Sequence, residues 1–244
     1  MIVENFPFLH HLGLHTYASS TMQTQMTRRT TTGSITRDRI ADLLAPFIGP
    51  VPLSDSQLDA IEVYLDLLLR WNAKLNLTAI RDPEEIVTRH FGESLFAARQ
   101  LFPASDSRET AIDIGSGAGF PGLPLKFWSP SLVLTLIESN QRKATFLREV
   151  VRTLKLNSVS VLSERAESVL LTADLVTFRA VERFEQILPI AFRLVNPPGR
   201  IAVLIGGAQV ALAQSALPNV GWETPIPIPL SRNGMLLIGE IRSE

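Results

Sequence analysis

The stretch "AIDIGSGAGFPGLPL", from Ala111 to Leu125, constrains the fold of this chain more than any other. An apolar strand pattern runs directly into a glycine-rich turn, and the pattern of a helix follows. This order is typical of the first strand, loop and helix of a nucleotide-binding domain of the Rossmann type. The stretch therefore predicts a cofactor site at the carboxyl end of a parallel sheet.

Two glycine spacings overlap in the turn, and each indicates a different cofactor. The dinucleotide spacing G-x-G-x-x-G is satisfied by Gly117, Gly119 and Gly122. The spacing D-x-G-x-G-x-G, found in enzymes that bind S-adenosylmethionine, is satisfied by Asp113, Gly115, Gly117 and Gly119.

Charge favours the second cofactor. A dinucleotide places an anionic pyrophosphate on the turn, where backbone amides and the helix dipole stabilise it. Asp113 would repel that phosphate, and Pro121 removes one amide donor from the turn. S-adenosylmethionine instead carries an ammonium and a sulfonium group, which a carboxylate attracts directly or through water. We therefore expect S-adenosylmethionine as methyl donor.

A second carboxylate supports a nucleoside cofactor without choosing between the two. Glu138 ends the next apolar strand, about 19 residues after Gly119, where a carboxylate accepts hydrogen bonds from ribose hydroxyls. A solvated glutamate in a tight connection would give the same pattern. The glycine turn, Asp113 and Glu138 together favour methyl transfer.

Short apolar runs alternate with helical patterns from Thr110 onward. Strands are expected at 110–114, 132–138, 159–162, 175–178 and 200–205. Helical patterns begin at Leu123, cover "RKATFLREVVRTLKL" and pass through Leu188 and Phe192. This alternation predicts an α/β fold with a mainly parallel, doubly wound sheet. Asn233-Gly234, between "WETPIPIPL" and "MLLIGEI", is a hairpin signal, so an antiparallel C-terminal hairpin should close the sheet.

The first hundred residues have a different character. Residues 1–36 are rich in Ser, Thr and Gln without an amphipathic period, which predicts a disordered extension; a targeting segment or an untranslated leader are the alternatives. Residues 37–109 are expected to form a helical portion, ahead of a methyltransferase domain at 110–244. Ser54 and Gln57 predict a capping box for a core-facing helix, Trp71 to Ile80 an ordered loop, and Asp82 the cap of a second helix.

Composition excludes several kinds of chemistry. The 244 residues contain no cysteine, so disulfides, zinc–thiolate sites, iron–sulfur clusters and cysteine nucleophiles are impossible. The formal net charge of -1 means that a polyanionic partner must be met by a local basic patch. No apolar run approaches the ~18 residues that span a bilayer, and we expect neither a membrane nor a metal as partner.

The "NPPG" sequence at 196–199 invites comparison with the N-P-P-Y loop of amino-group methyltransferases. That loop should end the fourth strand, which here is followed by Arg179 and Ala180. We interpret 196–199 as a turn before the fifth strand.

From about Leu58 to the C-terminus, the chain resembles the glucose-inhibited division protein B family, the bacterial 16S rRNA guanine-N7 methyltransferases. The similar stretches are "WNAKLNLTAIRDPEEIVTRH", "DIGSGAGFPGLPL", "LIESNQRKATFLREV", "SERAES" and "FRA". The resemblance implies a class I methyltransferase fold and methylation of one guanine, at position 527 in the usual rRNA numbering. It also implies 16S rRNA or a small ribosomal subunit particle as partner.

The resemblance further assigns residues. Cofactor contacts are implied at Gly115, Phe120, Ala166, Glu167 and Arg179. Contacts with the RNA or the reacting base are implied at Asn76, His90, Arg165 and Arg179. The chain departs from the family at Phe178, where relatives often have Ser, at Glu93, where they often have Asp, and at Ile205, where many have Lys.

Chemistry limits what these residues need to do. Guanine N7 carries an in-plane lone pair, so no general base is expected, and the two arginines and Asn76 would position base or RNA. A histidine on a helix with apolar neighbours, such as His90, is more often structural than a proton carrier, and Asn76 could instead cap the loop. A basic set with i, i+4, i+7 spacing is the candidate RNA surface, or else a solvated helix face: Arg148, Arg152 and Lys155.

Other functions stay open at the level of sequence. The alternatives are a methyltransferase for a protein or small metabolite and a nucleotide-binding module without catalysis. A cytoplasmic monomer is expected, and the sequence does not choose between naked rRNA and the ribosomal particle.

Overall fold

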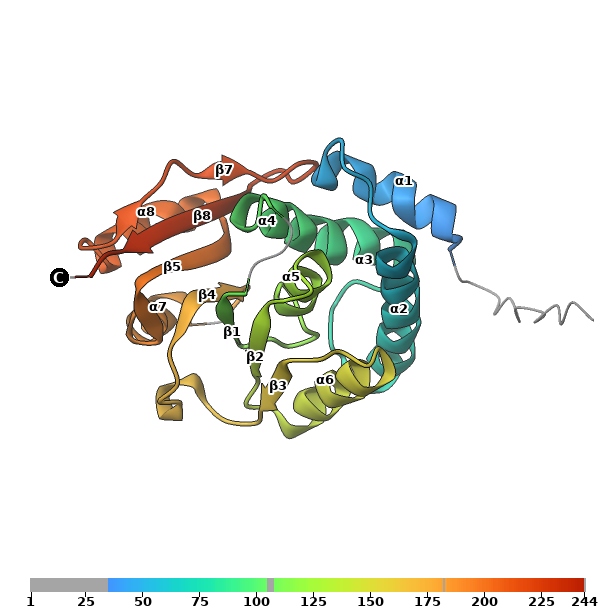
Figure 1. The fold of residues 1–244 in the computed structure, drawn as a ribbon, viewed down its shortest axis with the longest axis horizontal. Coiled ribbons are helices and arrows are strands. Elements are labelled where there is room, and N and C mark those ends of the chain that lie inside the picture. Colours follow the sequence, from blue (N-terminus) through green and yellow to red (C-terminus); the bar gives the residue numbers. More distant parts are fainter. Residues whose placement is uncertain (1–34, 105–107, 182, 244) are drawn as a thin grey trace, which may run out of the picture. The chain divides into compact units, whose positions relative to one another are not determined.

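The computed structural model describes residues 35–104, 108–181 and 183–243 (Figure 1). Their strands are β1 (Thr110–Ile114), β2 (Val133–Ile137), β3 (Val159–Leu162), β4 (Ala173–Arg179), β5 (Val195–Gly206), β6 (Gly221–Trp222), β7 (Ile226–Pro227) and β8 (Gly234–Ile241). Their α-helices are α1 (Arg37–Ile48), α2 (Asp55–Leu75), α3 (Pro83–Ile86), α4 (Glu93–Leu101), α5 (Gly122–Trp128), α6 (Gln141–Thr153), α7 (Phe184–Arg193) and α8 (Gly207–Ala216). A π-helical turn, η1 (Val87–Gly92), joins α3 to α4, and a 3₁₀ turn, η2 (Ala166–Ser168), follows β3.

The strands form one mixed sheet in the order β3-β2-β1-β4-β5-β8-β6, with β7 also paired to β8. β1 to β5 are parallel, and β8 runs antiparallel to β5 from Gly199↔Ile241 to Gly206↔Gly234. The α/β fold with a parallel sheet closed by antiparallel C-terminal strands is therefore confirmed. The hairpin indicated by Asn233-Gly234 is formed by β7 and β8, with residues 228–233 between the two strands and Gly234 as the first residue of β8.

Helices cover both faces of the sheet, which explains the nearly continuous apolar runs of the central strands. One face packs Leu134, Leu136 and Leu175 against the core that includes α1, α2, α4, α5 and α6. The other packs Ile112 and Val176 against α7 and α8. Figure 1 shows α7 and α8 on the opposite side of the molecule from α2 and α6.

The N-terminal helices begin where the sequence predicts. Ser54 and Gln57 form the expected capping box, and Asp82 caps α3 by accepting a hydrogen bond from the Glu85 amide at 2.8 Å. Four apolar residues of this second helical segment are fully buried: Ile86, Val87, Phe91 and Leu95. These helices share one hydrophobic core with the sheet, while the boundary between 37–109 and 110–244 stays a prediction.

The expected loop from Trp71 to Ile80 is wrong over its first half, because α2 continues to Leu75. Two tertiary contacts favour the longer helix. The Trp71 ring packs against Phe146 of α6 with 5.7 Å between ring centroids. Asn72 is buried, and its side chain bonds to the Thr78 amide and the Ile80 carbonyl, so the helix side chain itself orders the following loop.

The interpretation of residues 196–199 as a turn ahead of the fifth strand is also wrong. They lie inside β5, which begins at Val195, and the register with β4 shifts between Ala173 and Leu175. A Cβ at Gly199 would lie 2.6 Å from the Asn196 carbonyl oxygen and 2.9 Å from that of Asp174. Glycine is required there by the close approach of the two strands.

The predicted extension at 1–36 falls almost entirely outside the described residues. Of its last two residues, Ile35 packs against the core and Thr36 caps α1. Among the helices that the structure describes, none combines the length and the apolar character needed to cross a membrane.

Candidate functional site

The glycine turn between β1 and α5 depends on left-handed backbone angles. Gly115, Gly117 and Gly119 have φ values of 64°, 56° and 92°. A Cβ at Gly119 would lie 2.6 Å from Leu123 Cδ1 and even closer to the Tyr64 hydroxyl, so this position also requires a missing side chain. Gly115 is exposed and Gly117 is half-buried, which leaves the outer side of the turn open at the carboxyl edge of the sheet.

Asp113 lies beneath this turn and is fully buried. Its Oδ2 accepts a hydrogen bond from the Gly122 amide at 3.1 Å, at the start of α5. Within the described part of the chain, Oδ1 has no hydrogen-bond partner. Burial raises the pKa of Asp113 to about 7, against the opposing effect of the Gly122 and Ser116 hydrogen bonds. Asp113 therefore holds the junction of turn and helix in this structure, and the turn covers it.

Glu138 joins the ends of β1 and β2. Its Oε2 accepts from the Gly117 amide at 2.9 Å, and its Oε1 accepts from the Asn140 amide at 2.7 Å. The side chain is largely buried, with the residue 7% exposed. Each carboxylate oxygen has capacity for one further donor, which is the property that a ribose-binding residue needs.

Tyr64 of α2, which the sequence did not single out, also contacts the glycine turn. Its ring is fully buried, and its hydroxyl donates a hydrogen bond to the Ala118 carbonyl. The ring stacks on Phe120 at 5.4 Å with an interplanar angle of 7°, and His90 lies against Phe120 at 5.0 Å. Phe120, predicted to contact the cofactor, thus belongs to an aromatic stack that connects the turn with the helical portion.

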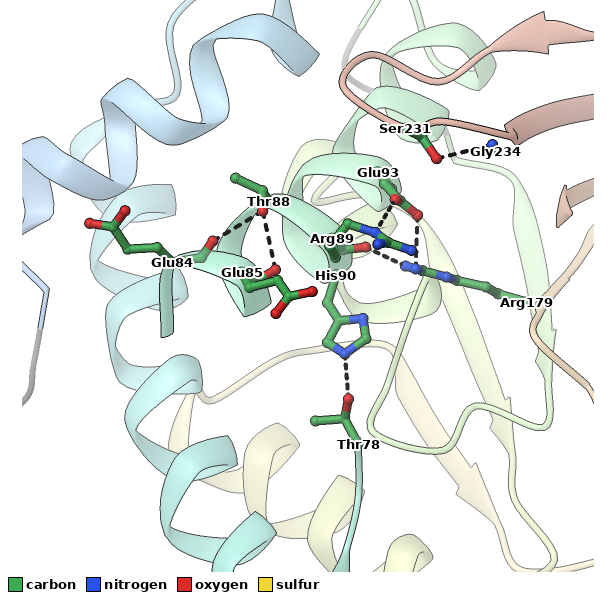
Figure 2. Close-up of polar contacts among 10 residues, drawn as sticks. All are labelled: Thr78, Glu84, Glu85, Thr88, Arg89, His90, Glu93, Arg179, Ser231 and Gly234. Atoms are coloured by element: carbon green, nitrogen blue, oxygen red, sulfur yellow. Dashed lines mark hydrogen bonds and ion pairs between the residues drawn. The ribbon is translucent and has the colours of Figure 1, made fainter. Parts of the chain in front are cut away.

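His90 and Asn76 both have clear structural roles. Thr78 Oγ1 lies 2.7 Å from His90 Nε2 (Figure 2). Burial, followed by the charges of Arg179 and Arg89, lowers the pKa of His90 to about 3, so the ring is neutral at pH 7. Asn76 ends α2 in the left-handed conformation, and its Oδ1 accepts from Arg81 at 2.6 Å.

Arg179, at the end of β4, is held by a buried carboxylate. Figure 2 shows Glu93 between two arginines: Arg179 Nη2 lies 2.8 Å from Oε2, and Arg89 Nε lies 2.8 Å from Oε1. Arg179 Nη1 also donates to the Arg89 carbonyl at 2.7 Å. The π-helical turn η1 carries Arg89, and Glu93 begins α4, so this local distortion brings both groups to the end of β4.

The third strand contributes a short turn. Arg165 and Glu167 are exposed there and Ala166 is buried, as expected for a turn at the sheet edge. Arg193 of α7 fixes this turn by donating to the carbonyls of Val169 at 2.8 Å and Ala166 at 3.2 Å. The unusual residues Phe178 and Ile205 are both buried.

The basic set on α6 is less regular than its spacing predicts. α6 ends at Thr153, and Lys155 follows with a φ of 50°, so the expectation of one continuous helical stripe is wrong. Arg152 pairs with Glu149 at 2.8 Å. Arg148 and Lys155 are exposed. Across the described residues, no group of three or more His, Asp or Glu side chains is placed to hold a metal ion.

Comparison with known proteins places this sheet edge in a family. The family model for rRNA small subunit methyltransferase G matches residues 57–215, which include every candidate residue from Asn76 to Arg179. The chain belongs to this family. The predicted family is thereby confirmed.

Individual relatives agree. The chain is 41% identical to Ribosomal RNA small subunit methyltransferase G of Chloroflexus aggregans over 194 residues, 73% of this chain and 79% of that protein. It is 41% identical to the protein of the same name from Stenotrophomonas maltophilia over 174 residues, 70% of this chain and 79% of that protein.

Solved structures show the same fold at low identity. A ribosomal protein L11 methylase from Lactobacillus delbrueckii has a TM-score of 0.54 at 12% identity, and the aligned region covers 64% of this chain and 79% of the methylase. A SAM-dependent methyltransferase from Aquifex aeolicus has a TM-score of 0.52 at 16% identity, covering 67% and 96%. The class I methyltransferase fold is confirmed.

Proposed function

We propose that this protein transfers the methyl group of S-adenosylmethionine to N7 of one guanine in 16S rRNA, at position 527 in the usual numbering. The observation that carries the proposal is the family match, because it spans the glycine turn, Glu138 and the Arg179 cluster (Arg89, Glu93 and Arg179) together. The geometry of that edge supports both the cofactor and the atom that is methylated.

The residues of the turn fit S-adenosylmethionine. The carboxylate of Glu138 can accept hydrogen bonds from ribose hydroxyls, and Asp113, which the turn covers, holds in place the turn that would receive the cofactor. When bound, S-adenosylmethionine supplies a methyl group on a positively charged sulfur. The residues that would hold it are Asp113, Gly115, Gly117, Gly119, Phe120, Glu138, Ala166, Glu167 and Arg179.

The proton chemistry of the site favours guanine N7 over an exocyclic amine or a carbon. An exocyclic amine or a carbon must lose a proton during methylation, whereas the N7 lone pair forms the new bond directly. His90 is a poor base because its pKa is about 3, and Asp113 is enclosed by the turn. The candidate residues thus offer alignment of the base in place of proton transfer, and alignment contributes about 7–11 kcal/mol in well-oriented reactions.

Glu93 makes an arginine compatible with this reaction. Methylation at N7 leaves a positive charge on the purine, which an unpaired arginine nearby would destabilise. The shared ion pair with Glu93 offsets part of the charge of Arg89 and Arg179 and orients the Arg179 guanidinium, which can then position base or phosphate by hydrogen bonds. Asn76, His90 and Arg165 complete the proposed positioning residues.

We infer further that the α6 basic set (Arg148, Arg152 and Lys155) contacts the RNA backbone, and that the enzyme acts as a cytoplasmic monomer. The exposed Arg148 and Lys155 support this surface. Either 16S rRNA or the small ribosomal subunit serves as the partner.

Methyl acceptance by purified RNAs tests the function. The full chain and radiolabelled S-adenosylmethionine are incubated with unmethylated 16S rRNA, with small subunit particles and, as a control, with 23S rRNA. Label on 16S rRNA or its particle is expected, and 23S rRNA should stay unlabelled. Good cofactor binding without label on either form of 16S rRNA would contradict the proposal and leave a methyltransferase for another acceptor.

A further inference from the structure

A cavity of about 490 Å³ lies beside the Arg179 cluster, at the carboxyl ends of β4 and β5. Its wall is completed by the loop between β7 and β8 (residues 228–233) and by Gly234 at the start of β8, all outside the segment matched by the family model. Ser231 and Gly234, which line the cavity together with Glu93 and Arg179, are drawn above Glu93 in Figure 2. The glycine turn follows β1 and does not line this cavity, although Arg179 borders the cavity and is also a proposed cofactor contact.

The loop is held in a defined shape. The Gly234 amide donates to Ser231 Oγ at 3.0 Å, and the Gly207 amide at the start of α8 donates to the Asn233 carbonyl at 2.9 Å. A Cβ at Gly234 would lie 2.4 Å from Ser231 Oγ, so glycine permits the turn. Arg232, at the centre of this loop, is therefore presented by an ordered backbone.

The charges that line the cavity select an anion. Three arginines, Arg89, Arg179 and Arg232, line the cavity together with one carboxylate, that of Glu93, which leaves an excess of positive charge. Arg89 and Arg179 are tied to Glu93, whereas Arg232 is exposed and has no hydrogen bond or ion pair to any described residue. An arginine with all its donors free, next to two others, is suited to a phosphate group.

The lining distinguishes a phosphate from a base. Single-stranded RNA bases are bound by stacking on aromatic side chains. The residues that line this cavity include no aromatic ring; its apolar members are Ala180, Leu204, Ile205, Ile228 and Leu230. Polar donors come from Gln209, Ser231 and Asn233. A phosphodiester with its ribose matches this wall better than a stacked base does.

We propose that this cavity binds a backbone phosphate of the substrate RNA close to the methylated guanine, with Arg232 as its main contact. This inference rests on the proposed function. The enzyme would then contact RNA at two places: at the α6 basic set, and at this cavity, whose loop lies far from α6 in the sequence. Binding there would fix the register of the strand relative to Arg179 without reading the base.

Arg232→Gln and Arg242→Gln form a matched pair for the test. Both arginines are exposed, and they flank the two ends of β8. Arg232 precedes Gly234, beside the cavity, whereas Arg242 follows Ile241 at the far end of the strand. The dissociation constant for unmethylated 16S rRNA is measured across a salt series for the full chain and both variants. Affinity for S-adenosylmethionine and the thermal midpoint are measured in parallel.

Loss of one phosphate contact has a defined signature. Arg232→Gln should lower the slope of log Kd against log salt by about 0.7–1 and weaken RNA binding about threefold to fivefold at about 0.15 M salt. The KM for RNA should rise while kcat, cofactor affinity and the thermal midpoint stay near wild type. Arg242→Gln should leave the slope unchanged.

Two results would overturn the inference in distinguishable ways. If wild type methylates 16S rRNA but the two variants give the same slope, the cavity does not bind phosphate and the proposed function stands. If wild type neither binds nor methylates the RNA, both proposals fail together.

Discussion

Removal of the Tyr64 hydroxyl tests whether the helical portion stabilises the cofactor turn. Tyr64→Phe keeps the ring, its burial and its stacking on Phe120, and it deletes only the hydrogen bond to the Ala118 carbonyl. Ala118 is 7% exposed, so its carbonyl would lose a partner in a largely dry environment. A buried group left without its hydrogen bond costs about 1–3 kcal/mol.

Part of that cost should appear as weaker cofactor binding. S-adenosylmethionine binds the ordered form of the turn. If the variant destabilises that form by about 1 kcal/mol relative to disordered forms, cofactor affinity should fall about fivefold. Titration calorimetry with S-adenosylmethionine measures this effect, and chemical denaturation measures the loss of stability.

Thr177→Val is the matched control. The Thr177 hydroxyl is also buried and donates to a carbonyl, that of Ala202, at 2.7 Å between β4 and β5. This variant should lose similar stability and keep its cofactor affinity. If Tyr64→Phe lowers stability as expected but binds S-adenosylmethionine as tightly as Thr177→Val does, the turn is ordered without Tyr64 and the reasoning is refuted.

Three further outcomes follow from the site. Burial lowers the pKa of His90 to about 3 and raises the pKa of Asp113 to about 7, so their effects on stability oppose each other between about pH 4.5 and 6.5. In that range the free energy of unfolding should fall with rising pH in His90→Gln, where Asp113 remains, and with falling pH in Asp113→Asn, where His90 remains, by about 1 kcal/mol per pH unit. Denaturation curves with the same pH slope for both variants would argue against both assignments. Glu93→Gln, which leaves two arginines unbalanced, should cost about 2–4 kcal/mol. Glu149→Gln, which breaks an exposed pair with Arg152, should cost less than about 1 kcal/mol by the same denaturation assay, and equal losses would refute the distinction. Neutralising the α6 basic set with glutamine should reduce the salt dependence of RNA binding, and an unchanged slope would remove that surface from the interface.

Sequence patterns predicted those parts of the fold and site that depend on near neighbours. The strand, turn and helix around Asp113 follow from residues within a single segment, and Glu138 follows from the length of one β-α-β unit. The capping residue Asp82 and the capping box of Ser54 and Gln57 are likewise local. These are the features that the structure places where the sequence predicts.

The features that were missed depend on contacts between distant segments. Tyr64 and Ala118 are 54 positions apart, and Arg179 and Arg89 are 90 apart, so neither pair has a local signal. The π-helical turn that carries Arg89 packs closely against α1 at Gly92, where a Cβ would lie 2.6 Å from the Phe47 ring. An aromatic residue within the apolar stripe of α2 was the available hint at Tyr64.

Mapping the methylated atom on 16S rRNA tests the central claim most directly. RNA labelled by the enzyme is treated with cleavage chemistry that is selective for 7-methylguanine, and the cut position is read by primer extension. The account predicts one cut, at guanine 527, that is absent when S-adenosylmethionine is omitted. Labelled RNA that resists this cleavage, or that is cut at another guanine, would contradict the assignment of the site to N7 of that base.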